Sequence, residues 1–107
     1  MTGTSKTIEW NLGFSTEEVT EGLEKSFNRA GYTYSRIEAD AETQFQIALS
    51  SGSLRVLVQP LPPHHSPFNP YSPSRRTRLV MMFAGVSSQE EADSLRRLTL
   101  TFLRAGG

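Results

Sequence analysis

The sequence predicts an α+β protein, a two-layer sandwich in which two helices cover one face of a five-stranded antiparallel sheet. Three observations lead to this prediction. Several short segments alternate apolar and polar residues, two longer segments carry apolar residues at helical spacing, and a Ser-Gly turn links two of the strands. The predicted order is β-α-β-β-β-β-α. With 107 residues the chain has the length of one domain, and we expect a single core for residues 1–107.

The first strand and the first helix have clear local signals. Residues 7–12 alternate apolar with polar side chains, as a half-buried strand requires. Ser15 and Glu18 then form a capping box that begins a helix, and Gly31 supplies its left-handed C-terminal cap. Gly22 is a small residue on the buried side, so we expect this helix to approach the sheet closely.

The rest of the chain carries four further segments rich in β-forming residues. They are residues 32–39, 44–49, 54–59 and 76–86. Ser51-Gly52 makes the turn that pairs the second of these strands with the third. The last segment is partly apolar on both faces, which predicts an interior strand. A second capping box, Ser88 with Glu91, begins the final helix.

Over the whole chain, this order of elements resembles that of the TATA-box-binding-protein-like fold. The chain has neither the paired intercalating phenylalanines nor the internal duplication of that protein. The resemblance therefore concerns topology and implies no function, because such folds host many unrelated activities.

Composition excludes several classes of protein. The chain has no cysteine, which excludes disulfides, thiolate metal sites and cysteine nucleophiles. No apolar run approaches the roughly 20 residues that cross a bilayer, and residues 1–6 lack a signal-peptide pattern, so we expect a cytoplasmic protein without membrane contact. Eleven acidic and eleven basic residues give no net charge, which disfavours nucleic acid as a partner.

A proline-rich segment interrupts the strands. Residues 60–73, PLPPHHSPFNPYSP, contain all six prolines and both histidines of the chain. Proline lacks an amide hydrogen, so we expect an irregular loop over residues 60–75. Two interpretations stay open: an extended arm that presents His64, His65, Phe68 and Tyr71 to a partner, or an insertion without a function. A PxxPxR match within this segment is typical of SH3 ligands, but it is short enough to arise by chance.

The two histidines are the obvious candidates for metal binding or catalysis. His64 and His65 are adjacent, so their side chains diverge in an extended segment, and no third ligand lies nearby in the sequence. No serine can be assigned as a nucleophile beside them. We therefore expect no metal, no cofactor and no enzymatic activity.

The sheet face away from the helices is the main candidate binding surface. On the last strand, Arg76 and Arg78 share this face with Met82, and Arg55 joins them from the neighbouring strand. An apolar patch edged by guanidinium groups suits a protein partner, a homodimer or a small anionic ligand, unless the proline-rich loop folds back over it. The predicted partner-binding residues are Arg55, Phe68, Tyr71, Arg76, Arg78 and Met82.

The C-terminus offers an alternative function. Residues 103–107, LRAGG, resemble the terminal Leu-Arg and Gly-Gly of ubiquitin-like modifiers and sulfur carriers. That resemblance implies a carrier protein acting through Gly106 and Gly107. Those families have two strands before the first helix, whereas this chain is predicted to have one. Here the two glycines directly follow a predicted helix, and the stop of that helix at the chain end is the favoured explanation for them.

Overall fold

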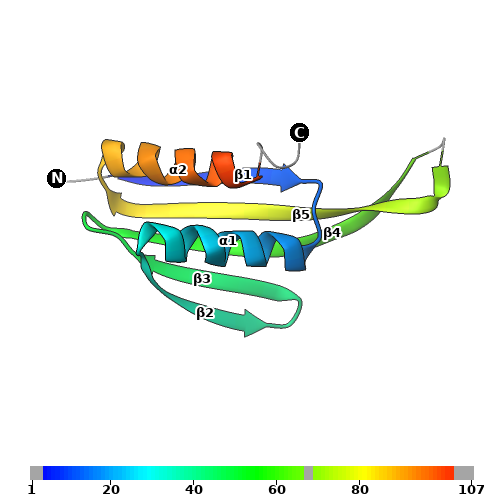
Figure 1. Cartoon of the computed structure of the whole chain (residues 1–107), viewed down its shortest axis with the longest axis horizontal. Coiled ribbons are helices and arrows are strands. Elements are labelled where there is room, and N and C mark those ends of the chain that lie inside the picture. Colours follow the sequence, from blue (N-terminus) through cyan, green and yellow to red (C-terminus); the bar gives the residue numbers. More distant parts are fainter. Residues whose placement is uncertain (1–3, 67–68, 103–107) are drawn as a thin grey trace.

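The computed structural model describes residues 4–66 and 69–102 (Figure 1). They form the elements β1 (Thr4–Leu12), α1 (Thr16–Ala30), β2 (Thr33–Ala39), β3 (Glu42–Ala48), β4 (Ser53–Ser66), β5 (Asn69–Val86) and α2 (Ser88–Phe102). The predicted α+β fold, with a five-stranded antiparallel sheet and two helices, is confirmed. None of the helices within these ranges has the length and apolar character needed to cross a membrane.

The strands lie in the order β1-β5-β4-β3-β2, and every neighbouring pair is antiparallel. The β5 strand lies between β1 and β4, so the prediction of an interior strand is confirmed. Both helices lie over the same face of the sheet and run in opposite directions (Figure 1). The opposite face of the sheet carries no helix in the described part of the chain.

The core lies between the sheet and the helices. Because side chains alternate across a strand, one set from each central strand faces the helices. The fully buried members of this core are Val19, Leu23, Phe27, Phe45, Ile47, Leu54, Val56, Val58, Leu79, Met81, Phe83 and Leu98. Phe27 of α1 packs on three other aromatic rings, those of Tyr32, Tyr34 and Phe45, at centroid distances of 6.2, 5.3 and 5.6 Å. Such tilted and edge contacts add to the stabilisation from burial.

The α1 helix begins and ends as predicted. The Ser15 hydroxyl accepts a hydrogen bond from the amide of Glu18 at 3.2 Å, and the capping box is complete. Gly31 adopts φ 76°, a left-handed value that favours glycine. The expected role of Gly22 is corrected: it lies against Phe102 of α2, so its small size brings two helices together.

The start of α2 differs from the prediction by one residue. Ser87 is the N-terminal cap, because its hydroxyl accepts from the amide of Glu90 at 3.2 Å and its carbonyl from the amide of Glu91. The predicted pairing of Ser88 with Glu91 is therefore wrong. Glu91 instead forms an ion pair with Lys6 of β1 at 3.1 Å, a partner that the local sequence does not reveal.

The prediction of an irregular loop over residues 60–75 is also wrong for those of its residues that the structure describes. Its two sides continue β4 and β5 as a hairpin, with Pro60 opposite Thr77 and His64 opposite Ser74. Register irregularities lie on either side of His64. A two-stranded ribbon leaves alternate amide positions unpaired, so proline can occupy such positions without the loss of a ladder hydrogen bond.

We call the part of this hairpin beyond Pro60 and Thr77 the arm. There, β4 and β5 pair only with each other among the described residues, because β3 pairs with β4 no further than Val58 and β1 with β5 no further than Thr77. The arm extends past the rest of the sheet (Figure 1). It helps to give the molecule extents of 51 × 29 × 25 Å.

Candidate functional site

The sheet face without helices is the site towards which most sequence predictions point. We define this outer sheet face by Glu9, Arg55, Leu57, Arg78, Val80 and Met82, which alternate with core residues on β1, β4 and β5. Strand register places these side chains in two rows across the sheet. Glu9, Val80 and Leu57 form one row, and Thr7, Met82 and Arg55 form the next.

The middle of the outer sheet face is apolar. Val80 is only 7% exposed although no described helix covers it, because it is surrounded by the side chains of its own face. Leu57 and Met82, on either side, are half-buried. Ile37, at the far end of the row that contains Leu57, is 46% exposed. An apolar centre within a polar surround is the usual composition of a protein interface.

Charged side chains of both signs surround this centre. The guanidinium of Arg78 pairs with the carboxylate of Glu9 at 2.8 Å, and both are about half exposed. Arg55 is exposed and makes no ion pair with any described residue. Towards β3, Glu42 accepts hydrogen bonds from the amide groups of Gln59 at 2.6 Å and Gln44 at 3.2 Å. The face is therefore nearly balanced in charge.

The structure brings together part of the predicted set. Arg55 and Met82 are direct neighbours across β4 and β5, and Arg78 lies two rows away, beyond the row of Val80 and Leu57. Arg76 lies opposite Leu61, at the base of the arm. For Tyr71 only the backbone is described, on the β5 side of the arm, and Phe68 lies outside the described residues.

The sequence did not identify Glu9 as a member of this site. Its outward position follows from the alternation of residues 7–12, but its pairing with Arg78 depends on how β1 aligns with β5. These strands are separated by the whole of the intervening chain, so no local pattern reveals their register.

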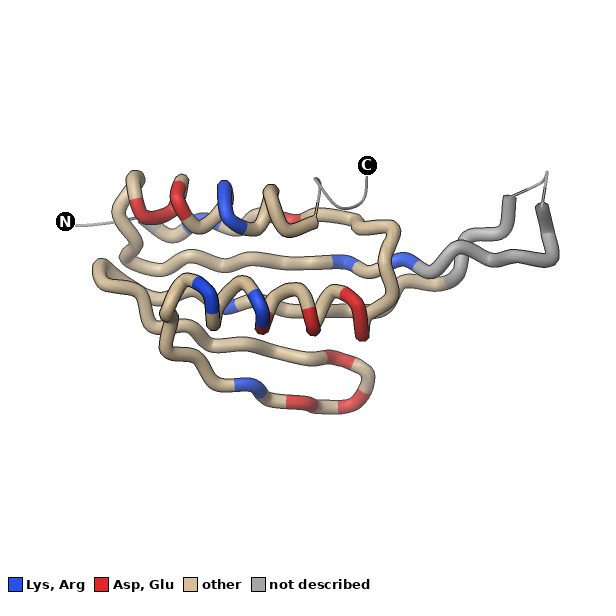
Figure 2. The backbone as a smooth tube through the Cα atoms, viewed as in Figure 1, with Lys and Arg blue, Asp and Glu red and all other residues tan. Residues whose placement is uncertain are grey.

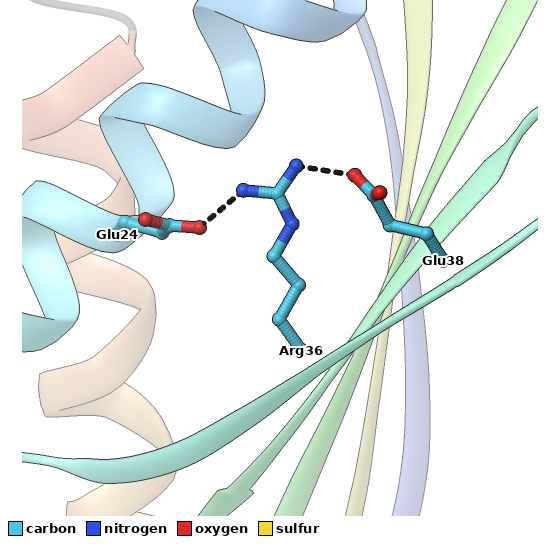
Figure 3. A network of polar contacts seen from close by, with 3 residues as sticks. All are labelled: Glu24, Arg36 and Glu38. Atoms are coloured by element: carbon cyan, nitrogen blue, oxygen red, sulfur yellow. Dashed lines mark hydrogen bonds and ion pairs between the residues drawn. The ribbon is translucent and has the colours of Figure 1, made fainter.

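A second cluster of charge lies between α1 and the β2–β3 hairpin. Arg36 on β2 bridges Glu24 of α1, at 2.6 Å, and Glu38 of its own strand (Figure 3). Hydrogen bonds from both carboxylates, first from Glu38 and then from Glu24, raise the pKa of Arg36 above its ordinary value. The three side chains tie the edge strand to the helix layer, and we assign them a structural role.

A third polar cluster ties the β3–β4 turn to α2. The carboxylate of Glu90 accepts hydrogen bonds from the amides of Ser50 at 3.0 Å and Ser51 at 2.9 Å, and from both hydroxyls. These hydrogen bonds lower the pKa of Glu90 to about 2, with the Ser51 hydroxyl as the largest cause. The hydroxyl of Ser51 also accepts from the amide of Ser87, the cap of α2.

The predicted histidines and terminal glycines are not described in enough detail to place them in a site. Within the described part of the chain, no three His, Cys, Asp or Glu side chains converge as metal ligands would. His64 and His65 lie on the β4 side of the arm, where the backbone alone is described. Gly106 and Gly107, on which the carrier hypothesis depends, lie outside the described residues.

Comparisons with known protein families and with curated proteins find no match to this chain.

Proposed function

We propose that the protein is a non-enzymatic module that forms a homodimer through its outer sheet face, with the arm adding contact area. The observation that carries this proposal is the cluster of Val80, Leu57 and Met82 at the centre of this face, which no described helix covers. Sheets with one apolar face normally bury it against another layer. The cytoplasmic location and the TATA-box-binding-protein-like topology stay part of the proposal, supported by composition and by element order.

Charge favours a second copy of the same chain as the occupant. Glu9 and Glu42 nearly balance the guanidinium groups of Arg55, Arg76 and Arg78 on this side of the sheet. A face that carries both signs meets its own copy without strong repulsion, and an isologous interface can place a cation of one copy beside a carboxylate of the other. This face has no large excess of either charge that would attract a strongly acidic or strongly basic partner.

The size of the face explains why the arm enters the proposal. Strands about 4.8 Å apart with a rise of about 3.3 Å per residue give five strands of seven residues a footprint of roughly 500 Å². A standard interface buries about 800 Å² on each partner. Because the sheet face alone is small, contact with the arm of the second copy would complete the interface.

The experiment is size-exclusion chromatography with light scattering at several protein concentrations. Met82→Glu places a charge at the apolar centre and should convert the dimer to a monomer. Ala92→Glu is the matched control, because Ala92 is exposed on α2 in the opposite layer, and it should leave the dimer intact. Arg55→Glu is a second test at an exposed position that does not depend on how Met82 packs.

A shortened arm tests the second half of the proposal. Leu61 and Arg76 are paired across the hairpin, so residues 62–75 can be replaced by Asn-Gly, which makes a two-residue turn. We expect this variant to form a weaker dimer, which dissociates at protein concentrations at which the wild-type dimer is still intact. A wild-type protein that is monomeric at every concentration, or a dimer unaffected by both Met82→Glu and Arg55→Glu, would refute the proposal.

A further inference from the structure

A groove runs between α1 and α2, on the opposite side of the molecule from the outer sheet face. Its volume is about 480 Å³. Cationic side chains line it from both helices: Lys25 and Arg29 from α1, and Arg97 from α2. We call it the basic groove.

Small residues create the space for this groove. Gly22 and Ser26 face α2 one turn apart, and at Gly22 a Cβ would lie 2.8 Å from the Phe102 ring. The helices therefore meet closely at Gly22, and beside this contact the hydroxyl of Ser26 lines the groove.

Because of the distribution of charge along α1, the charged side chains that this helix contributes to the groove are all cationic. Figure 2 shows that the acidic residues of α1 precede its basic residues along the helix. Among the described residues no carboxylate lines the groove, and neither Lys25, Arg29 nor Arg97 forms an ion pair with any of them. Favourable contact with the helix dipole accounts for Arg29 in the last turn of α1, but it does not account for Arg97, which reaches the groove from another helix.

We propose that the basic groove binds a phosphate group carried on a small organic body. Guanidinium and ammonium groups are the side chains that bind phosphate most strongly, through charge-assisted hydrogen bonds. Leu100 is 50% exposed at the same groove and offers apolar contact to the organic part. The volume lies within the range of roughly 300–1,000 Å³ that small-molecule sites occupy.

This proposal is independent of the homodimer, because the groove and the outer sheet face lie on opposite layers. Nucleic acid is the less favoured source of phosphate. The basic groove is short and the chain has no net charge. Proteins that bind nucleic acid instead use an extended basic surface that follows the sugar-phosphate backbone.

The test is a titration of the full-length protein with sodium pyrophosphate at constant ionic strength, followed by amide chemical shifts. We expect saturable shifts at Ser26, Arg29, Arg97 and Leu100. Arg97→Gln should weaken binding about tenfold or more, because it removes a charge-assisted contact. Arg96→Gln is the matched control: Arg96 is the exposed neighbour and does not line the groove.

Two further arms distinguish the source of the phosphate. Glucose 6-phosphate represents a soluble ester, and phosphatidylcholine vesicles with phosphatidylinositol phosphate represent a lipid headgroup. Binding to either that is weakened by Arg97→Gln and by Lys25→Gln supports the site and names its source. Equal weakening by Arg96→Gln, absence of saturable pyrophosphate shifts, or binding only to a single-stranded RNA oligonucleotide would overturn the proposal.

Discussion

Gly52, in the turn before β4, lies directly against the backbone of Ala84 on β5. A Cβ at Gly52 would collide with the carbonyl oxygen of Ala84 and with the backbone of Gly85. The same turn is closed by a hydrogen bond of 2.9 Å from the amide of Leu49 to the carbonyl of Gly52. Close approach of two backbones therefore requires glycine at this position, in addition to the turn that the sequence predicts.

The first prediction follows from this contact. Gly52→Ala should lower the free energy of unfolding by about 2 kcal/mol, because the clash is with main-chain atoms that cannot rotate away. Gly13→Ala is the control, since a Cβ there would meet nothing within 4 Å, and its effect should stay below about 1 kcal/mol. Urea unfolding measures both. Equal effects would show that β5 moves to accommodate a side chain at residue 52.

The second prediction concerns the contact between the two helices. Gly22→Ala gains about 1 kcal/mol of helix propensity. It should still destabilise the protein by about 1 kcal/mol overall, because the new methyl group overlaps the Phe102 ring. In a Phe102→Leu background the ring is absent and the same change should be neutral or stabilising. A double-mutant cycle without coupling between these positions would contradict the packing described here.

The third prediction concerns acid stability. The pKa of Glu90 falls from an ordinary value of 4.5 to about 2 in the folded protein, so its hydrogen bonds stabilise the fold fully above pH 4.5. That contribution is lost as the pH falls from 4.5 to about 2. The difference in unfolding free energy between wild type and Glu90→Gln should therefore shrink over this range.

Glu17→Gln is the control for this measurement. Glu17 is exposed and accepts no hydrogen bond from a described residue, so its replacement should not change the pH dependence in the same way. Urea unfolding at pH 6, 4, 3 and 2 provides the comparison. A constant difference between wild type and Glu90→Gln at all four values would refute the role of the Ser50 and Ser51 hydrogen bonds.

The fourth prediction concerns the edge of the sheet. Arg36→Gln should destabilise the protein by less than about 1 kcal/mol, because the ion pairs with Glu24 and Glu38 are exposed to solvent. The effect should decrease further at high salt, which screens such pairs. Thermal unfolding at low and high sodium chloride concentration measures it. A large, salt-independent loss would indicate that Arg36 contributes through packing of its stem.

Local signals in the sequence were sufficient for most of the secondary structure. The capping box at Ser15 and Glu18 and the cap at Gly31 are confirmed, because such signals act within a few residues. The β4–β5 hairpin is longer than the sequence predicts, because its prolines, which lack an amide hydrogen, lie within both strands. Whether a proline costs a ladder hydrogen bond depends on which side of its strand has a neighbour, and that is a property of the sheet.

The candidate site, too, could be predicted from the sequence only in part. Alternation in the sequence placed Arg55, Arg78 and Met82 on one face, since a period of two holds along any strand. The ion pair of Arg78 with Glu9 depended on strand register, and the basic groove on the packing of two helices far apart in the chain. Apolar periodicity and local caps thus determined the elements and their buried sides. Only the tertiary structure decided which of their charged side chains meet, because those contacts join segments that are far apart in the sequence.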